Sequence, residues 1–143
     1  MKIERTGSAI WSGGIKDGRG QISTQTGALN GYPYGFGSRF EGQPGSNPEE
    51  LLGAAHAACF TMALSLILGE AGLKADRMET TARVTLEQVS GGFAIPAVHL
   101  TLNASVPGAT DAVFQDLAAK AKAGCPVSKV LNAAITLEAR LAG

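Results

Sequence analysis

The sequence has only two cysteines, few aromatic side chains and no excess of either charge. Twelve Lys and Arg residues balance twelve Asp and Glu residues. A nucleic-acid-binding protein needs a basic excess to neutralise phosphates, so the composition argues against that class. Hydrophobic residues nevertheless make up 45% of the 143 residues, which is enough to build a core and excludes a disordered tail. The length fits one domain spanning residues 1–143.

The sequence also lacks an obvious secretory signal or membrane span. Residues 1–6 contain no apolar run and no small-residue cleavage site. The most hydrophobic stretch, about residues 51–68, contains His56 and many alanines and has acidic residues at its ends. We interpret it as a buried helix, shorter and more polar than a membrane span. We therefore expect a cytoplasmic protein that does not contact a membrane.

The first half of the chain predicts short strands followed by a long helix. Residues 6–11 and 20–26 are β-prone and are separated by a glycine-rich turn. Asn47 is a good N-cap, Pro48 suits the first helical position, and two glutamates favour the positive end of the helix dipole. Gly72 is expected to end the helix.

The second half predicts a hairpin, a helix and a strand. Residues 82–89 and 98–105 alternate apolar and polar side chains and are joined by glycines, and Pro96 indicates an edge or a bulge. A helix over residues 111–123 and a strand over 135–141 follow. The order of strands, helix, strands, helix and strand predicts an α+β domain without internal repeats.

The two cysteines are the first candidates for chemistry. By number alone they could be inert, since free cysteine is among the most buried residue types. Cys59 lies about twelve residues past the helix cap, so the dipole of its own helix cannot lower its pKa and a cation from elsewhere is needed. Arg39 is the best candidate by context, and Lys16 and Arg19 are alternatives.

Cys125 has a different setting, at the start of a short helix whose first position is Pro126. The exposed amides of such a helix start favour a thiolate and a good leaving group, as a resolving cysteine requires. The alternative, equally open from these residues, is that Cys125 merely caps the helix.

A zinc site is a weaker possibility. His56 and Cys59 are spaced i, i+3 on one helical face, and His99 with Cys125 could complete a Cys2His2 set. However, a histidine on an alanine-rich helix is typical of a packed core residue, and His99 falls on the polar face of a strand. We therefore expect no metal.

Glu49 allows two interpretations. It stabilises a helix start generically, or it accepts hydrogen bonds from the arginine and fixes the guanidinium beside the thiol. Ten residues separate Glu49 from Cys59, which is ~15 Å along one helix. If both serve one site, Glu49 must come from a second copy of the chain or the helix must break. A catalytic Glu49 in an unbroken helix therefore predicts a homodimer.

One segment holds most of the aromatic side chains of the chain. These side chains form either the wall of an apolar substrate pocket or part of the core. The candidates for substrate binding are Tyr32, Tyr34, Phe36 and Phe40.

Together these segments resemble the osmotically inducible protein C (OsmC) branch of the OsmC/Ohr organic hydroperoxide resistance family. The match extends over essentially the whole chain, and the two cysteine segments are its most specific part. The matching segments are YGF at 34–36, SRFEG at 38–42, NPEEL at 47–51, GAAHAACF at 53–60, MALS at 62–65 and KAGCPVS at 122–128.

The resemblance implies an intertwined α+β homodimer with long central helices wrapped by antiparallel β-sheets. It implies a peroxidatic role for Cys59 and a resolving role for Cys125, with an arginine–glutamate pair that falls on Arg39 and Glu49. In the Ohr branch the arginine comes from the early glycine-rich turn, so the cations of that turn remain alternatives.

The implied activity is reduction of organic hydroperoxides, and less efficiently of hydrogen peroxide, to alcohols. Cys59 becomes a sulfenic acid, Cys125 condenses with it to a disulfide, and an external dithiol, such as a lipoyl-bearing protein, restores both. No metal, flavin or nucleotide is required. One alternative is a non-catalytic module of the same fold that binds a hydrophobic ligand. Another is an acyl-transfer enzyme, for which His56 is poorly placed as a base.

Overall fold

The computed structural model describes all residues, 1–143, and the chain divides into two compact units, Met1–Leu51 and Leu52–Gly143. Each unit is described by itself below. The grouping of both into a single domain stays a prediction.

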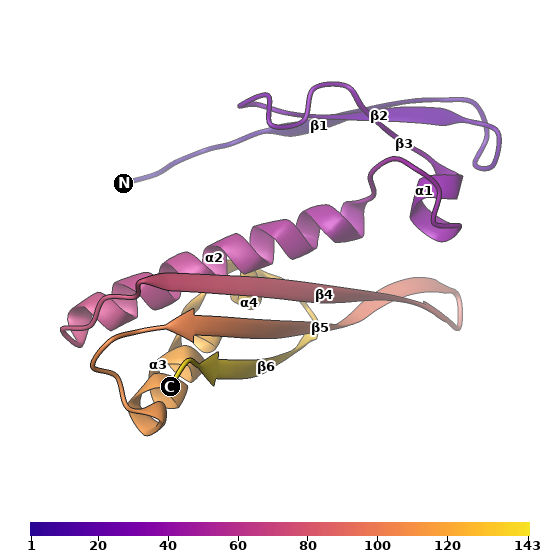
Figure 1. Ribbon diagram of the computed structural model, residues 1–143. Helices are drawn as coiled ribbons and strands as arrows, with labels where there is room; N and C mark the ends of the chain where they lie inside the picture. The colour runs from indigo at the N-terminus through magenta and orange to yellow at the C-terminus, as the bar shows by residue number, and fades with distance from the viewer. The chain divides into compact units, whose positions relative to one another are not determined.

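The first unit contains a small antiparallel sheet in the order β1-β2-β3 and a short helix (Figure 1). Its elements are β1 (Gly7–Ser12), β2 (Arg19–Thr24), β3 (Tyr32–Tyr34) and α1 (Phe36–Phe40). The first two strands confirm the sequence prediction to within about two residues. β3 and α1 were not predicted, because three and five residues are too few to show a strand or helix period.

The long helix α2 (Pro48–Glu70) begins and ends where its caps predict. The Oδ1 of Asn47 accepts a hydrogen bond from the backbone N–H of Glu50 at 2.8 Å. At the other end Gly72 has a φ of +74°, and the N–H of Leu73 bonds back to the carbonyl of Leu68 at 2.8 Å. This is a Schellman end, which requires the left-handed backbone that glycine adopts without strain.

α2 is longer and more apolar than the sequence analysis assumed. It has 23 residues, and by length and composition alone it could cross a membrane. The expectation that this stretch is shorter and more polar than a membrane span was therefore wrong. The prediction of a core helix is confirmed for one face only. The buried positions of this face are Gly53, His56, Phe60, Leu64 and Leu68.

The second unit is built on a mixed sheet in the order β4-β5-β6. β4 (Arg77–Val89) and β5 (Gly92–Ser105) form the predicted antiparallel hairpin. β6 (Ala134–Leu141) pairs in parallel with β5, so the expectation of antiparallel sheets is wrong for this pair. The physical reason is the crossover through α3 (Asp111–Gly124) and α4 (Pro126–Val130), which returns the chain to the end where β5 began.

Pro96 lies at an irregularity in the hairpin. Thr85 pairs with Ala97, but the next pair is Glu87 with Ala94, so the register shifts at this point. Proline has no N–H to donate to a ladder, which is why the bulge forms here. Of the two predicted alternatives, edge or bulge, the structure has the bulge.

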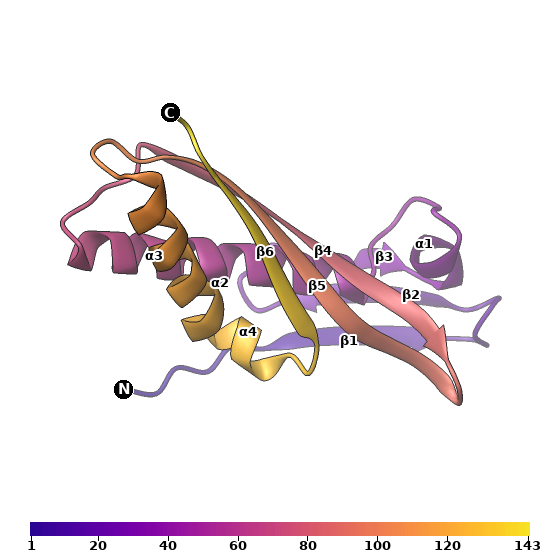
Figure 2. The ribbon, with the colours of Figure 1, turned by 90° about the horizontal axis from the view of Figure 1, so that it is seen from below.

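The core of the second unit is formed by one face of this sheet together with α2 and α3. In Figure 2, α2 passes behind the strands and α3 crosses in front of α2. Alternate residues of β5 point into it, as the period of a strand requires. α3 adds its predicted face, and the hydroxyl of Thr110 caps its start. The largest fully buried apolar side chains are Phe60, Phe114, Leu64, Leu68, Leu100, Leu102 and Val98.

Candidate active site

The second unit brings the two cysteines together. Cys59 projects from α2 and is partly exposed, whereas Cys125 precedes α4 and is fully buried. Both are free thiols, and a hydrogen bond joins their side chains. Residues 66 positions apart in the sequence therefore form one thiol pair.

The surroundings of Cys59 in this unit favour its neutral form. Burial raises the pKa of the Cys59 thiol, and the hydrogen bond to Cys125 and the charge of Cys125 raise it further. Only the backbone N–H of Val127 lowers it. No cation is among the groups that shift the pKa of Cys59 in this unit, and the expectation that a cation from elsewhere activates it stays a prediction.

The surroundings of Cys125 favour the thiolate. Burial alone would raise the pKa of the Cys125 thiol, but the hydrogen bond from Cys59, the amide and hydroxyl of Ser128 and the amide of Val127 together lower it. Cys125 is the N-cap residue of α4 and Pro126 is its first position, as predicted, so these amides are the free ones of a helix start. Within this thiol pair the pKa of Cys125 is therefore lowered and that of Cys59 raised.

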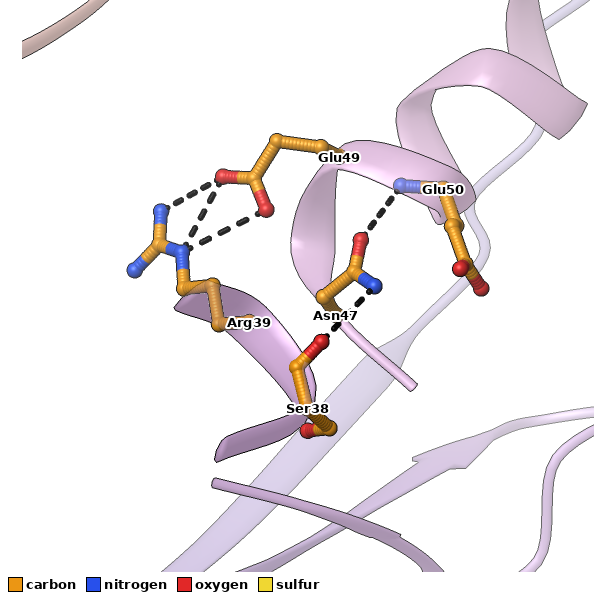
Figure 3. Close-up of polar contacts among 5 residues, drawn as sticks. All are labelled: Ser38, Arg39, Asn47, Glu49 and Glu50. Carbon is orange, nitrogen blue, oxygen red and sulfur yellow. Dashed lines mark hydrogen bonds and ion pairs between the residues drawn. The ribbon is translucent and has the colours of Figure 1, made fainter. Parts of the chain in front are cut away.

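The first unit brings Arg39 and Glu49 together (Figure 3). Arg39 Nη2 lies 2.6 Å from Glu49 Oε1, and Arg39 Nε donates to Oε1 at 3.1 Å and to Oε2 at 3.3 Å. The Glu49 side chain is 11% exposed and the Arg39 side chain 36%. Two nitrogens of the guanidinium thus contact one carboxylate, and this bidentate geometry fixes the plane of the guanidinium.

The local sequence places both partners of this ion pair. Arg39 lies in α1 and Glu49 in the first turn of α2, and the amide of Asn47 reaches the carbonyl of Ser38 at 3.5 Å between them. The guanidinium also lies 5.4 Å from the centre of the Phe40 ring. The predicted arginine–glutamate contact is present, while its placement beside Cys59 stays a prediction.

The two alternative cations lack such a carboxylate. Lys16 Nζ lies 5.6 Å from the centre of the Phe36 ring, and Arg19 is an exposed residue of β2. Neither forms a salt bridge. Of the three candidates, Arg39 is the one whose charge is held in a fixed orientation.

The four aromatic candidates lie in the same unit as Arg39, and none of them is buried. Tyr34 packs against Trp11 at 5.5 Å between ring centres, and Phe36 packs against Phe40 at 5.0 Å. Tyr32 is 46% exposed. Filling a buried core therefore does not account for these side chains, and their role in substrate binding stays a prediction.

Comparison with known proteins shows the family of this chain. A family model described as OsmC-like protein matches residues 40–140. The chain belongs to the OsmC-like protein family. It is 55% identical over 141 residues to the peroxiredoxin OsmC of Escherichia coli (strain K12), with 99% of each chain covered. It is 34% identical over 102 residues to an organic hydroperoxide resistance protein of Xanthomonas axonopodis pv. citri, which covers 71% of this chain and 70% of that protein.

Solved structures of the OsmC/Ohr family share the fold. The crystal structure of the organic hydroperoxide resistance protein OhrB of Bacillus subtilis matches with a TM-score of 0.70 and 29% identity, covering 94% of this chain and 98% of that one. The higher identity to OsmC than to the Ohr proteins agrees with the predicted branch. By this membership the chain is a thiol-dependent peroxidase.

Both histidines of this OsmC-like chain have a hydroxyl partner. His56 is fully buried with Nε2 2.7 Å from Ser128 Oγ, and burial lowers its pKa. His99 Nδ1 lies 2.6 Å from Thr136 Oγ1. No group of three or more His, Cys, Asp or Glu side chains could hold a metal ion, so the zinc set considered above does not form.

Sequence reasoning missed Ser128 as a member of the site. A usable signal was present, because Ser128 stands three residues after the helix-start cysteine, the spacing of a capping box. The contact with His56 had no such signal, since 72 residues separate the two.

Proposed function

We propose that this protein reduces organic hydroperoxides to alcohols, with Cys59 as the attacking thiol and Cys125 as the resolving thiol. The observation that supports this most directly is the hydrogen bond between the two thiols at the start of α4. The names of the relatives, a peroxiredoxin and an organic hydroperoxide resistance protein, support the same substrate class. Hydrogen peroxide is expected to be a poorer substrate.

The first step is attack by Cys59. Its thiol gives up its proton to solvent, and the thiolate attacks the distal peroxide oxygen. The O–O bond breaks, Cys59 becomes a sulfenic acid, and the alkoxide takes the proton from Cys125 and leaves as an alcohol. Cys125 is then a thiolate beside the sulfenic acid.

The second step forms the disulfide. The Cys125 thiolate bonds to Cys59 Sγ, and hydroxide leaves. An external dithiol, such as a lipoyl-bearing protein, then reduces the disulfide and restores both thiols. No metal, flavin or nucleotide takes part in these steps. A thiol pair that must be reduced after each turnover suits the reducing cytoplasm, which is the compartment we propose.

The cation for Cys59 comes, in this proposal, from a second copy of the chain. α2 is continuous from Pro48 to Glu70, so the alternative of a break between Glu49 and Cys59 is removed. The ~15 Å of helix between them prevents Glu49, and the Arg39 bound to it, from serving the Cys59 of the same helix. The exposed apolar face of α2, with Met62 76% and Leu66 66% exposed, supports an intertwined homodimer.

The two alternative functions have less support. A ligand-binding module would not need two free thiols that interact with each other. An acyl-transfer enzyme needs a histidine base on the nucleophile, but His56 Nε2 is occupied by Ser128 and burial lowers the pKa of His56. No contact favours either function over the peroxidase.

Replacing Cys125 with serine tests the resolving role. The variant is expected to reduce one equivalent of an organic hydroperoxide rapidly, because the attacking thiol remains, and then to lose steady-state turnover by about a hundredfold or more. Cys59 should go on to sulfinic acid, since no thiol intercepts the sulfenic acid. Stopped-flow kinetics with mass analysis of Cys59 measure both effects. Unchanged steady-state turnover without overoxidation would contradict a resolving Cys125.

A further inference from the structure

One buried hydrogen bond connects the two segments that carry the cysteines, and the steps proposed above do not use it. His56 Nε2 lies 2.7 Å from Ser128 Oγ. His56 precedes Cys59 by three residues on α2, and Ser128 follows Cys125 by three residues on α4. Although 72 residues of sequence separate the two partners, the contact therefore lies close to both cysteines along the chain.

The His56 ring is neutral and is the donor in this contact. The side chain is fully buried, which lowers its pKa, and its Nδ1 atom has no hydrogen-bond partner. A proton on Nδ1 would be a buried donor without an acceptor, whereas a proton on Nε2 is donated to the Ser128 hydroxyl oxygen. The ring therefore has the Nε2–H tautomer.

The short helix α4 has few other contacts that fix its position. It has five residues and none of them is buried, so its packing is less extensive than that of α2 or α3. Its backbone hydrogen bonds lie within its own turn, and the amide of Cys125 bonds back to Ala121 in α3. Apart from contacts of the cysteine sulfurs, the Ser128 hydroxyl makes the one hydrogen bond that joins α4 to α2.

This hydrogen bond differs from the sulfur contacts because oxidation of the cysteines does not alter its atoms. The contacts of Cys59 and Cys125 change when either sulfur is oxidised, whereas an imidazole N–H and a hydroxyl take no part in those steps. Because His56 is fully buried, water does not compete for the bond. The contact therefore joins α4 to α2 also while Cys59 is a sulfenic acid.

We propose that His56 is a positioning residue that, through Ser128, holds α4 on α2 and so keeps Cys125 within bonding reach of oxidised Cys59. This inference rests on the proposed function. The Cys125 thiolate formed in the first step bonds to Cys59 Sγ, the S–O bond of the sulfenic acid breaks, and hydroxide leaves. A freely moving α4 would lower the effective concentration of Cys125 in this step. The contact thereby favours the disulfide over a second oxidation of Cys59 to sulfinic acid.

The first test measures the disulfide without any peroxide. Each chain is equilibrated with mixtures of reduced and oxidised glutathione, and the share of Cys59–Cys125 disulfide gives the effective concentration of the thiol pair. His56→Leu and Ser128→Ala are each expected to lower this concentration about fivefold, the equivalent of one hydrogen bond. The double variant should show the same loss, because both substitutions remove one shared contact. His56→Gln, whose amide N–H can replace Nε2–H, should retain most of the native value.

Thr136→Val is the matched control, because it removes the hydroxyl that lies 2.6 Å from Nδ1 of His99, the other histidine of the same unit. Its effective concentration should equal the native one. The second test uses excess organic hydroperoxide. The ratio of sulfinic acid to disulfide at Cys59 should rise about fivefold in Ser128→Ala and should not change in Thr136→Val.

Unchanged glutathione equilibria in both His56→Leu and Ser128→Ala would overturn the proposal. A double variant whose loss is the product of the two single losses would overturn it as well, since the two residues would then act separately. Ser128 lies on a helix without buried residues, so Ser128→Ala should fold even if His56→Leu does not. A native chain that forms no Cys59–Cys125 disulfide with glutathione would contradict the proposed function itself, so the two failures are distinguishable.

Discussion

Replacing Cys59 with serine is expected to abolish hydroperoxide turnover, with a loss of more than about a thousandfold. A hydroxyl is not ionised at neutral pH and does not form the sulfur–oxygen bond of a sulfenic acid. Serine keeps a hydrogen-bond donor toward Cys125, so the packing around α4 should be retained. Steady-state reduction of an organic hydroperoxide by a dithiol measures the effect.

Thr61→Ser is the matched control for this substitution. It places a serine on the same helix two residues away, and the hydroxyl that bonds to the carbonyl of Ala57 is retained. Its turnover should equal that of the native chain. The surroundings of Cys125 lower its pKa, so the two cysteine substitutions are compared in the same assay. If Cys59→Ser stayed active while Cys125→Ser was dead, Cys125 would be the attacking thiol.

Replacing Arg39 with methionine is expected to lower turnover by about a hundredfold, with Cys59 still present. The reason is that burial and Cys125 raise the pKa of Cys59 within the second unit, so formation of its thiolate depends, in the proposed mechanism, on an imported positive charge. Arg39→Lys should recover only part of the loss, because an ammonium cannot reproduce the fork contact with Glu49. The rate of the first peroxide reduction, measured by stopped flow, isolates this effect from recycling. Arg19→Met is the control, and a larger loss there than in Arg39→Met would move the catalytic cation to the glycine-rich turn.

The same substitution tests whether the site is shared between two chains. A heterodimer is prepared from one Cys59→Ser chain and one Arg39→Met chain, each carrying a different tag. If Arg39 acts on the cysteine of the partner chain, one site contains both substitutions and the other site contains neither. The heterodimer should then have about half of the native activity. If each chain forms its own site, both sites are damaged and the activity of the heterodimer stays about a hundredfold or more below that of the native dimer.

Local signals predicted most of the fold. Asn47 and Gly72 located the ends of α2, and the glycines before β5 located the hairpin, because caps and turns depend on residues next to each other. The parallel pairing of β6 was missed, because it depends on the path of a crossover and not on any residue of the strand. The short α1 was missed for lack of a period.

Those parts of the site that depend on residues near one another in the sequence could be predicted. Pro126 revealed the helix start at Cys125, and ten residues between Glu49 and Cys59 led to the homodimer proposal. The contact between His56 and Ser128 connects two helices that only the folded chain brings together. The lowered pKa of Cys125 likewise depends on donors from both helices that outweigh the effect of its burial, so no sequence pattern predicts it.

The most direct measurement of the central claim is a mass analysis of the native chain after one equivalent of an organic hydroperoxide. The account predicts one alcohol formed per chain, a loss of two hydrogens from the chain, and a single peptide cross-link between Cys59 and Cys125 of the same chain. Dithiol treatment should reverse the change. Two thiols that remain free after the hydroperoxide is consumed, or a disulfide that joins two chains, would contradict it.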